Sequence, residues 1–78
     1  MKKETIYEHA RRIEYLYGHQ CEIARDEGMA FEEYTPRDLV LTAAALLDVM
    51  EEWDVLPPEA KQQQRLLRNF VNKWRVTL

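Results

Sequence analysis

Residues 34–53, YTPRDLVLTAAALLDVMEEW, combine the clearest helix start in the chain with a long apolar pattern. Thr35 can cap the helix, Pro36 suits its first position, and Asp38 suits its positive amino-terminal end. Apolar residues then recur at helical spacing over a broad face, which is typical of a helix with two neighbours. The residues of this face are Leu39, Ala43, Leu46, Met50 and Trp53, flanked by Val40, Leu47 and Val49. The pattern predicts a helix over residues 36–53.

The preceding segment, residues 4–27, repeats the helical spacing of apolar residues. Gly18 interrupts the pattern at a cost of about 1 kcal/mol relative to alanine, so it predicts a kink or the close approach of another helix. Gly28 suits the left-handed conformation that ends many helices, and we expect the helix to end near Glu27. The expected core face consists of Ile6, Ala10, Ile13, Tyr17 and Ala24.

A third helix is predicted over residues 58–75, because Pro57 and Pro58 end the second helix and proline suits a first helical turn. Its expected inner side consists of Ala60, Gln63, Leu67, Phe70, Val71 and Trp74. Short connections between amphipathic helices favour antiparallel neighbours. The sequence therefore predicts a single all-α domain over residues 1–78, a small three-helix bundle with up-down-up topology. In an alternative form of this fold, the first helix bends at Gly18. The connecting residues Met29, Phe31 and Tyr34 are expected to cap the end of the bundle.

The composition limits the classes of protein to which the chain can belong. It has 78 residues and one cysteine, so an internal disulfide is excluded and a partner is the natural supplement to a small core. No apolar run approaches the roughly 20 residues that cross a bilayer, and no apolar segment follows the first lysines. We expect a cytoplasmic protein that does not enter a membrane.

Residues with catalytic or metal-binding chemistry are few. The chain lacks serine, and His19 lies two residues from Cys21, so the two side chains project from nearly opposite sides of a helix. His19, Glu22 and Asp26 share one helical face, but neither a second cysteine nor a His-Glu-x-x-His motif accompanies them. We expect this face to be solvated, and we predict a protein that is not an enzyme and has no cofactor or metal.

Two groups of residues suggest a protein interface. Tyrosine and arginine, the types that most often anchor interfaces, recur at four-residue steps away from the core face of residues 4–27. Two apolar residues also fall outside the arc of residues 36–53, which indicates a further neighbour or a second copy in a homodimer. The predicted protein-binding residues are Tyr7, Arg11, Arg12, Tyr15, Leu41 and Ala45. The leading hypothesis is a non-enzymatic interaction module, a small regulator or inhibitor that binds the surface of a partner protein.

The uneven charge supports two alternatives. The first 60 residues carry 6 of the 11 basic residues and all 14 acidic ones, a net charge of −8, whereas the remaining residues are basic. A stripe at helical spacing could follow a phosphate backbone, although the whole chain is acidic, with a net charge of −3. Its residues are Lys61, Arg65, Arg68, Asn72 and Arg75. Alternatively, carboxylates such as Glu51, Glu52 and Asp54 occupy a nucleic-acid-binding groove on another protein, as in some phage-encoded inhibitors of host defence.

Overall fold

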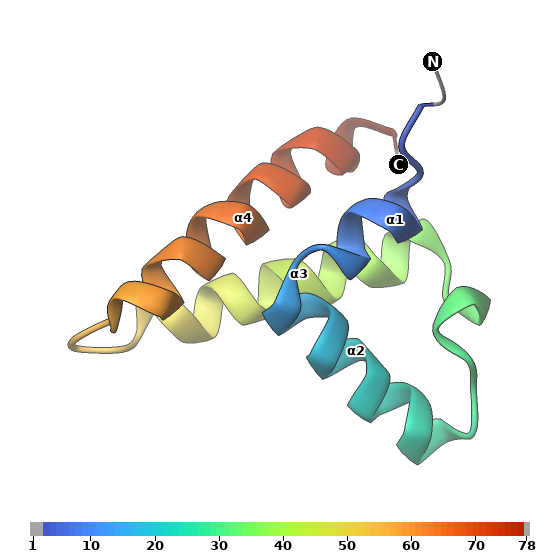
Figure 1. Cartoon of the computed structure of the whole chain (residues 1–78), viewed down its shortest axis with the longest axis horizontal. Helices are drawn as coiled ribbons and strands as arrows, with labels where there is room; N and C mark the ends of the chain where they lie inside the picture. Colours follow the sequence, from blue (N-terminus) through green and yellow to red (C-terminus); the bar gives the residue numbers. More distant parts are fainter. Residues whose placement is uncertain (1–2, 78) are drawn as a thin grey trace.

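The computed structural model describes residues 3–77, in which every regular element is a helix (Figure 1). Within these residues the elements are α1 (Ile6–Arg11), α2 (Glu14–Glu27), η1 (Phe31–Glu33), α3 (Pro36–Glu51), α4 (Pro58–Trp74) and η2 (Arg75–Thr77), where η marks a short 3-10 helix. The three longer helices α2, α3 and α4 pack against one another, which confirms the predicted small all-α bundle. No helix in this part of the chain combines the length and the apolar character needed to cross a membrane.

The predicted cap of the second helix is present at the start of α3. The Asp38 amide donates a 3.2 Å hydrogen bond to the Thr35 hydroxyl, and the Thr35 amide donates one of 3.2 Å to the Asp38 carboxylate. These reciprocal bonds satisfy two backbone donors that the first helical turn leaves unpaired. The start of α3 is therefore fixed by local chemistry.

Helices α3 and α4 form the most extensive contact in the molecule and run antiparallel (Figure 1). Helices α1 and α2 join them around one cluster of buried apolar side chains, to which Leu39, Leu67 and Phe70 contribute without exposing any surface. Burying one such side chain completely contributes roughly 1.5–3 kcal/mol. The members of the cluster are Ile6, Ala10, Ile13, Leu16, Ala24, Phe31, Tyr34, Leu39, Val40, Ala43, Met50, Leu67 and Phe70.

The predicted continuous helix over residues 4–27 is wrong, because the chain breaks between α1 and α2. Ile13 has an extended backbone with φ −101° and ψ 101°, and its side chain is 1% exposed. Gly18 lies inside the uninterrupted helix α2, and a Cβ placed on it would meet no atom within 4 Å. Neither the kink nor the close approach expected at Gly18 exists. The break instead lies at Ile13, whose side chain is buried in the core.

The break also changes which side of α2 faces the core. Leu16 and Gln20 are buried in place of Tyr17, which was predicted to be a core residue but is 37% exposed. An uninterrupted helix would have kept Tyr17 in line with Ile6; the extended residue at the break rotates α2 relative to α1. The ring of Tyr17 instead meets the edge of Phe31, with 5.0 Å between centroids.

The connection from α2 to α3 follows the sequence prediction. Gly28 adopts φ 69° in the left-handed region, and the Met29 amide donates a 2.8 Å hydrogen bond to the Ala24 carbonyl. This pattern ends α2 at Glu27. The connecting residues Phe31 and Tyr34 are 6% and 7% exposed, so they cover the end of the core as expected.

The prediction of the α3 core face is wrong for its residues Val49 and Trp53. Helix α3 ends at Glu51 instead of residue 53, and Trp53 lies beyond it with 44% of its surface exposed. Val49 is 51% exposed, because α4 covers the opposite side of α3.

Candidate protein-binding surfaces

The Tyr7 side chain joins α1 to the connection before α3. Its hydroxyl donates a 2.6 Å hydrogen bond to the backbone carbonyl of Tyr34, and its ring stands edge-on to Phe31 with 6.1 Å between centroids. Tyr7 is half-buried. Its hydroxyl and ring are thus engaged within the chain.

The two arginines of the predicted interface also have partners within the chain. Arg11 forms an ion pair with Glu32, and its guanidinium lies 5.6 Å from the Phe31 ring centroid. Arg12 holds the Glu4 carboxylate with two hydrogen bonds of 2.7 and 2.9 Å. These bonds lower the pKa of Glu4 and raise the pKa of Arg12, because each group stabilises the charge of the other.

Tyr15 lies on the other side of the helix break. Its amide donates a 3.2 Å hydrogen bond to the Gln63 side-chain oxygen, and its half-buried side chain packs against the core. The four-residue steps from Tyr7 through Arg11 to Tyr15 assumed one continuous helix. Since the structure divides it into α1 and α2, these residues do not form a single helical face.

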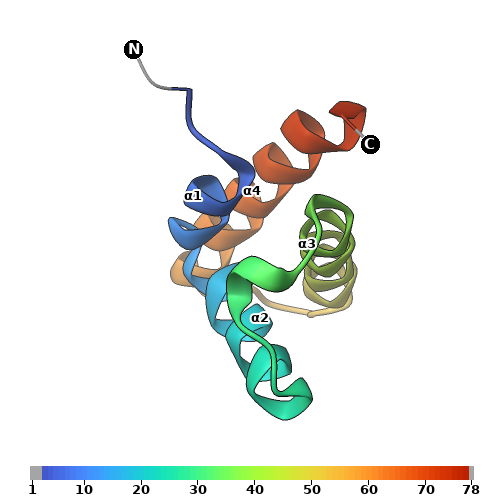
Figure 2. The same cartoon turned by 90° about the vertical axis from the view of Figure 1, so that its right-hand side faces the viewer.

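The remaining predicted residues, Leu41 and Ala45, are both exposed on α3. Val49 continues the same row at a further step of four residues, and Trp53 is exposed just past the end of α3; the four apolar residues are here called the α3 ridge. Leu41, Val49 and Trp53 are 55%, 51% and 44% exposed. Figure 2 views α3 nearly along its axis, with the other helices on one side and no described helix on the opposite side.

Acidic residues flank the α3 ridge. Asp38, Asp48 and Glu52 are exposed, and each lies three, four or seven residues from a ridge residue, so they share its side of the helix. The one basic residue of α3 is the exposed Arg37, which lies four residues before Leu41 and so heads the same row. The ridge is therefore an apolar strip within a mainly acidic surface.

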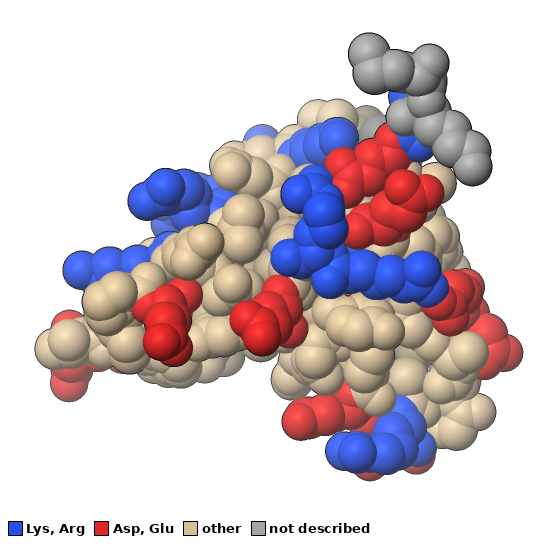
Figure 3. Space-filling view, viewed as in Figure 1, with Lys and Arg blue, Asp and Glu red and all other residues tan. Residues whose placement is uncertain are grey.

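Helix α4 carries the predicted basic stripe as far as Asn72; the helix ends at Trp74 instead of residue 75, and Arg75 lies in η2. The five residues of the stripe are exposed, and lysine and arginine atoms extend along the α4 side of the face shown in Figure 3. Over α1, in contrast, basic and acidic atoms alternate (Figure 3). Among the described residues, Lys61, Arg65 and Arg68 form no ion pair.

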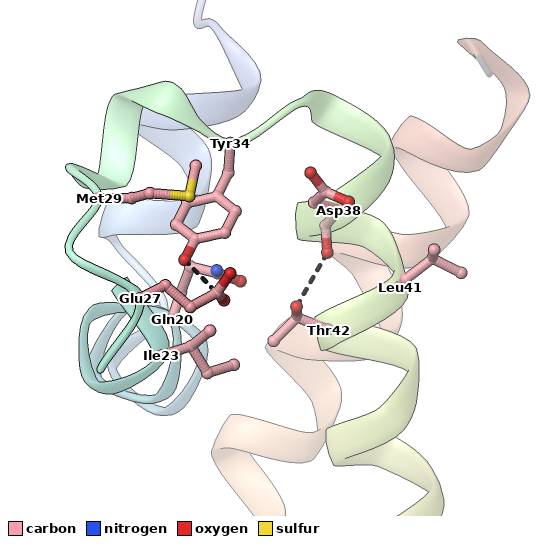
Figure 4. Close-up of a pocket in the computed structure, with 8 residues that line it drawn as sticks. All are labelled: Gln20, Ile23, Glu27, Met29, Tyr34, Asp38, Leu41 and Thr42. Carbon is pink, nitrogen blue, oxygen red and sulfur yellow. Dashed lines mark hydrogen bonds between the residues drawn. The ribbon is translucent and has the colours of Figure 1, made fainter. Parts of the chain in front are cut away.

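A pocket of about 350 Å³ opens between α2 and α3, here called the α2–α3 pocket (Figure 4). Tyr34 lines it, and its hydroxyl donates a 3.0 Å hydrogen bond to the Glu27 carboxylate. Gln20 is 1% exposed, and its side-chain oxygen has no hydrogen-bond partner. The residues that line the pocket are Gln20, Ile23, Glu27, Met29, Tyr34, Asp38, Leu41 and Thr42. Of these, the sequence singled out Leu41 as a binding residue; glutamine on a helix gave no signal of burial.

Residues with reactive or metal-binding side chains lie apart. Cys21 is a free, half-buried thiol packed against the core. Within residues 3–77, no three side chains of histidine, cysteine, aspartate or glutamate gather closely enough to hold a metal ion, including the face of His19, Glu22 and Asp26. In comparisons with protein families, curated proteins and solved structures, the chain matches none.

Proposed function

We propose that this chain is a non-enzymatic protein-interaction module that binds a partner protein through the α3 ridge. The supporting observation is the row of exposed apolar side chains from Leu41 to Val49 on a helix whose other side packs in the core, together with the exposed Trp53 just past the end of that helix. Single exposed apolar residues are common, but a continuous apolar strip rimmed by polar residues is typical of a protein interface. A partner that buries the ridge also supplements a small core.

The charges around the ridge define the partner. The acidic residues Asp38, Asp48 and Glu52 outnumber Arg37 around the apolar row, so a complementary surface carries apolar side chains with mainly lysine and arginine around them. A nucleic-acid-binding groove on another protein has this charge. The hypothesis of an acidic inhibitor, which names the exposed Glu51, Glu52 and Asp54, requires a partner of the same charge.

A second copy of the chain fits the ridge less well. Twofold association through α3 would place the same acidic side chains opposite one another, which disfavours the contact. The exposed face of α4 has the opposite charge, but its residues Lys61, Arg65, Arg68 and Asn72 are polar and supply no apolar surface for the ridge. A partner of different sequence is favoured.

The test compares capture of partners from the native lysate by matched variants. Leu41→Ser together with Val49→Ser removes apolar surface from the ridge without adding charge, whereas Val76→Ser removes a valine that is 78% exposed elsewhere. We expect the wild-type chain and the Val76→Ser variant to capture the same partner protein, and the ridge variant to capture none of it. The helicity of both variants should equal that of the wild type. Its contact surface should be basic. Identical capture by all three chains would contradict the proposal.

The exposed basic stripe of α4 favours nucleic-acid binding as a second candidate function. Lys61, Arg65 and Arg68 are free of ion pairs among the described residues, so their charges are available to phosphate groups. Binding to duplex DNA or RNA should weaken steeply with salt, and Arg65→Glu with Arg68→Glu should weaken it further. Absence of a mobility shift at low salt would exclude this candidate.

A further inference from the structure

The floor of the α2–α3 pocket contains a buried acceptor without a donor. The Tyr34 hydroxyl gives its one hydrogen to Glu27, so it has none to donate to the side-chain oxygen of Gln20. The Gln20 oxygen is then left unpaired. A buried oxygen without a donor costs stability, so its presence at a pocket indicates a ligand that supplies the hydrogen.

The other polar groups of the pocket are also acceptors. The Glu27 carboxylate lies beside the Gln20 amide, and Asp38 lies on the opposite wall (Figure 4). The Thr42 hydroxyl donates its hydrogen to the Asp38 backbone carbonyl at 2.9 Å, and the Tyr34 hydrogen is taken by Glu27. Both hydroxyl hydrogens are thus used within the chain. The pocket presents oxygen acceptors and two carboxylates, which select a ligand that is cationic and rich in donors.

The remaining walls suit an alkyl chain. Ile23, Met29 and Leu41 supply apolar surface around the acceptors, and a volume of about 350 Å³ is at the small end of ligand sites. Such a space fits one side chain. A guanidinium matches the acceptors better than an ammonium, because its planar fork donates in several fixed directions and it is more weakly hydrated.

We propose that the α2–α3 pocket binds the guanidinium of an arginine side chain presented by the partner protein. The pocket shares Leu41 and Asp38 with the α3 ridge and its flank, so one partner surface reaches both. The inference rests on the proposed function for the source of the arginine. It also agrees with the basic rim expected of that partner.

The test titrates short blocked peptides into the ¹⁵N-labelled chain and follows the amide resonances by NMR. The probe is Ac-Ala-Arg-Ala-amide, and the matched peptides carry citrulline, which is a neutral analogue of arginine, or lysine. We expect saturable shifts of the Gln20 side-chain amide and of the Ile23 and Leu41 backbone amides with the arginine peptide. The lysine peptide should bind at least several-fold more weakly, and the citrulline peptide should cause no saturable shift. Equal responses to arginine and citrulline, or to arginine and lysine, would overturn the assignment.

Variants locate the response in the pocket. Gln20→Met removes the acceptor and Glu27→Gln removes a negative charge, each with little change of shape. Each variant should abolish the saturable shifts of the Ile23 and Leu41 amides. Glu22→Gln, an exposed change on the opposite side of α2, should bind like the wild type. Wild-type affinity in both pocket variants would refute the site. Because the titration needs no partner, its failure refutes the pocket alone, whereas unchanged capture by the Leu41→Ser, Val49→Ser variant refutes the ridge.

Discussion

The indole N–H of Trp74 donates a 2.9 Å hydrogen bond to Nδ1 of His9, which joins the end of α4 to α1. His9 is half-buried, and its ring meets the edge of Phe70 with 5.2 Å between centroids. Accepting this bond requires an unprotonated Nδ1. Burial lowers the pKa of His9 below its ordinary value of 6.5; Glu4 opposes this shift, and the positive charges of Arg12 and Lys73 add to it.

The stability of the fold should therefore depend on the protonation of His9. Because the pKa of His9 is lower in the folded chain, the unfolded chain binds more protons as the pH falls below about 6.5. The contribution of the neutral His9 ring to the free energy of unfolding is complete above that pH. It is lost as the pH falls through the pKa of His9 in the folded chain. Urea unfolding from about pH 5.5 to 7.5 measures this window. His9→Gln should flatten the dependence, while His19→Gln at an exposed position should preserve it; a wild-type slope in the His9 variant would refute the prediction.

The two glycines should respond in opposite directions to alanine. Gly28→Ala places a side chain at φ 69° and should lower the free energy of unfolding by about 1–2 kcal/mol. Gly18→Ala lies within α2 with no atom within 4 Å of the new Cβ, and should raise it by about 0.5–1 kcal/mol. Thermal and urea unfolding measure both effects. A stabilising Gly28 variant would contradict the helix end, and a destabilising Gly18 variant would contradict the continuous α2.

Two leucines test which sides of α3 and α4 form the core. Leu67 is fully buried, so Leu67→Ala should lower the free energy of unfolding by about 2–5 kcal/mol. Leu41 is 55% exposed, and Leu41→Ala should change the free energy of unfolding by less than about 0.5 kcal/mol. Similar losses in the two variants, measured by denaturant unfolding, would show that the α3 ridge is packed within the fold.

The unpaired oxygen of Gln20 should cost stability in the free chain. Gln20→Met keeps the length of the side chain and removes the acceptor, and Tyr34 retains Glu27 as its acceptor. Since a buried unsatisfied acceptor costs about 1–3 kcal/mol, we expect the variant to be more stable by about 1 kcal/mol. Gln62→Met on the exposed side of α4 is the control and should be near neutral. A clear loss of stability in Gln20→Met would show that this oxygen is satisfied in solution.

Local chemistry made much of the fold predictable. The Thr35–Asp38 cap, the left-handed Gly28 and the two prolines at the start of α4 act through neighbouring residues, and the structure contains each of them. The break before α2 was not predictable in this way. Ile13 is neither glycine nor proline, and its extended backbone accompanies the complete burial of its side chain in the assembled core.

The sequence predicted the residues of a candidate site only where their exposure on one helix was sufficient to define the site. Leu41 and Ala45 lie outside the apolar arc of their own helix, so the sequence marked them as surplus, and both are exposed. The partners of Arg11 and Arg12 were not predictable, because Glu32 and Glu4 come from segments outside the α-helices. Gln20 was missed since its burial follows from the rotation of α2 at the break.

The central claim is that the α3 ridge contacts a basic, apolar surface of a partner protein, and site-specific photo-crosslinking tests it most directly. A benzophenone side chain replaces Ala45 on the ridge in one chain and Asn69 on the exposed side of α4 in another. The account predicts that position 45 gives a discrete adduct with one partner protein and that position 69 gives no adduct with that protein. The partner's crosslinked peptide should be flanked by lysine or arginine. The same adducts from both positions, or no adduct at position 45, would contradict it.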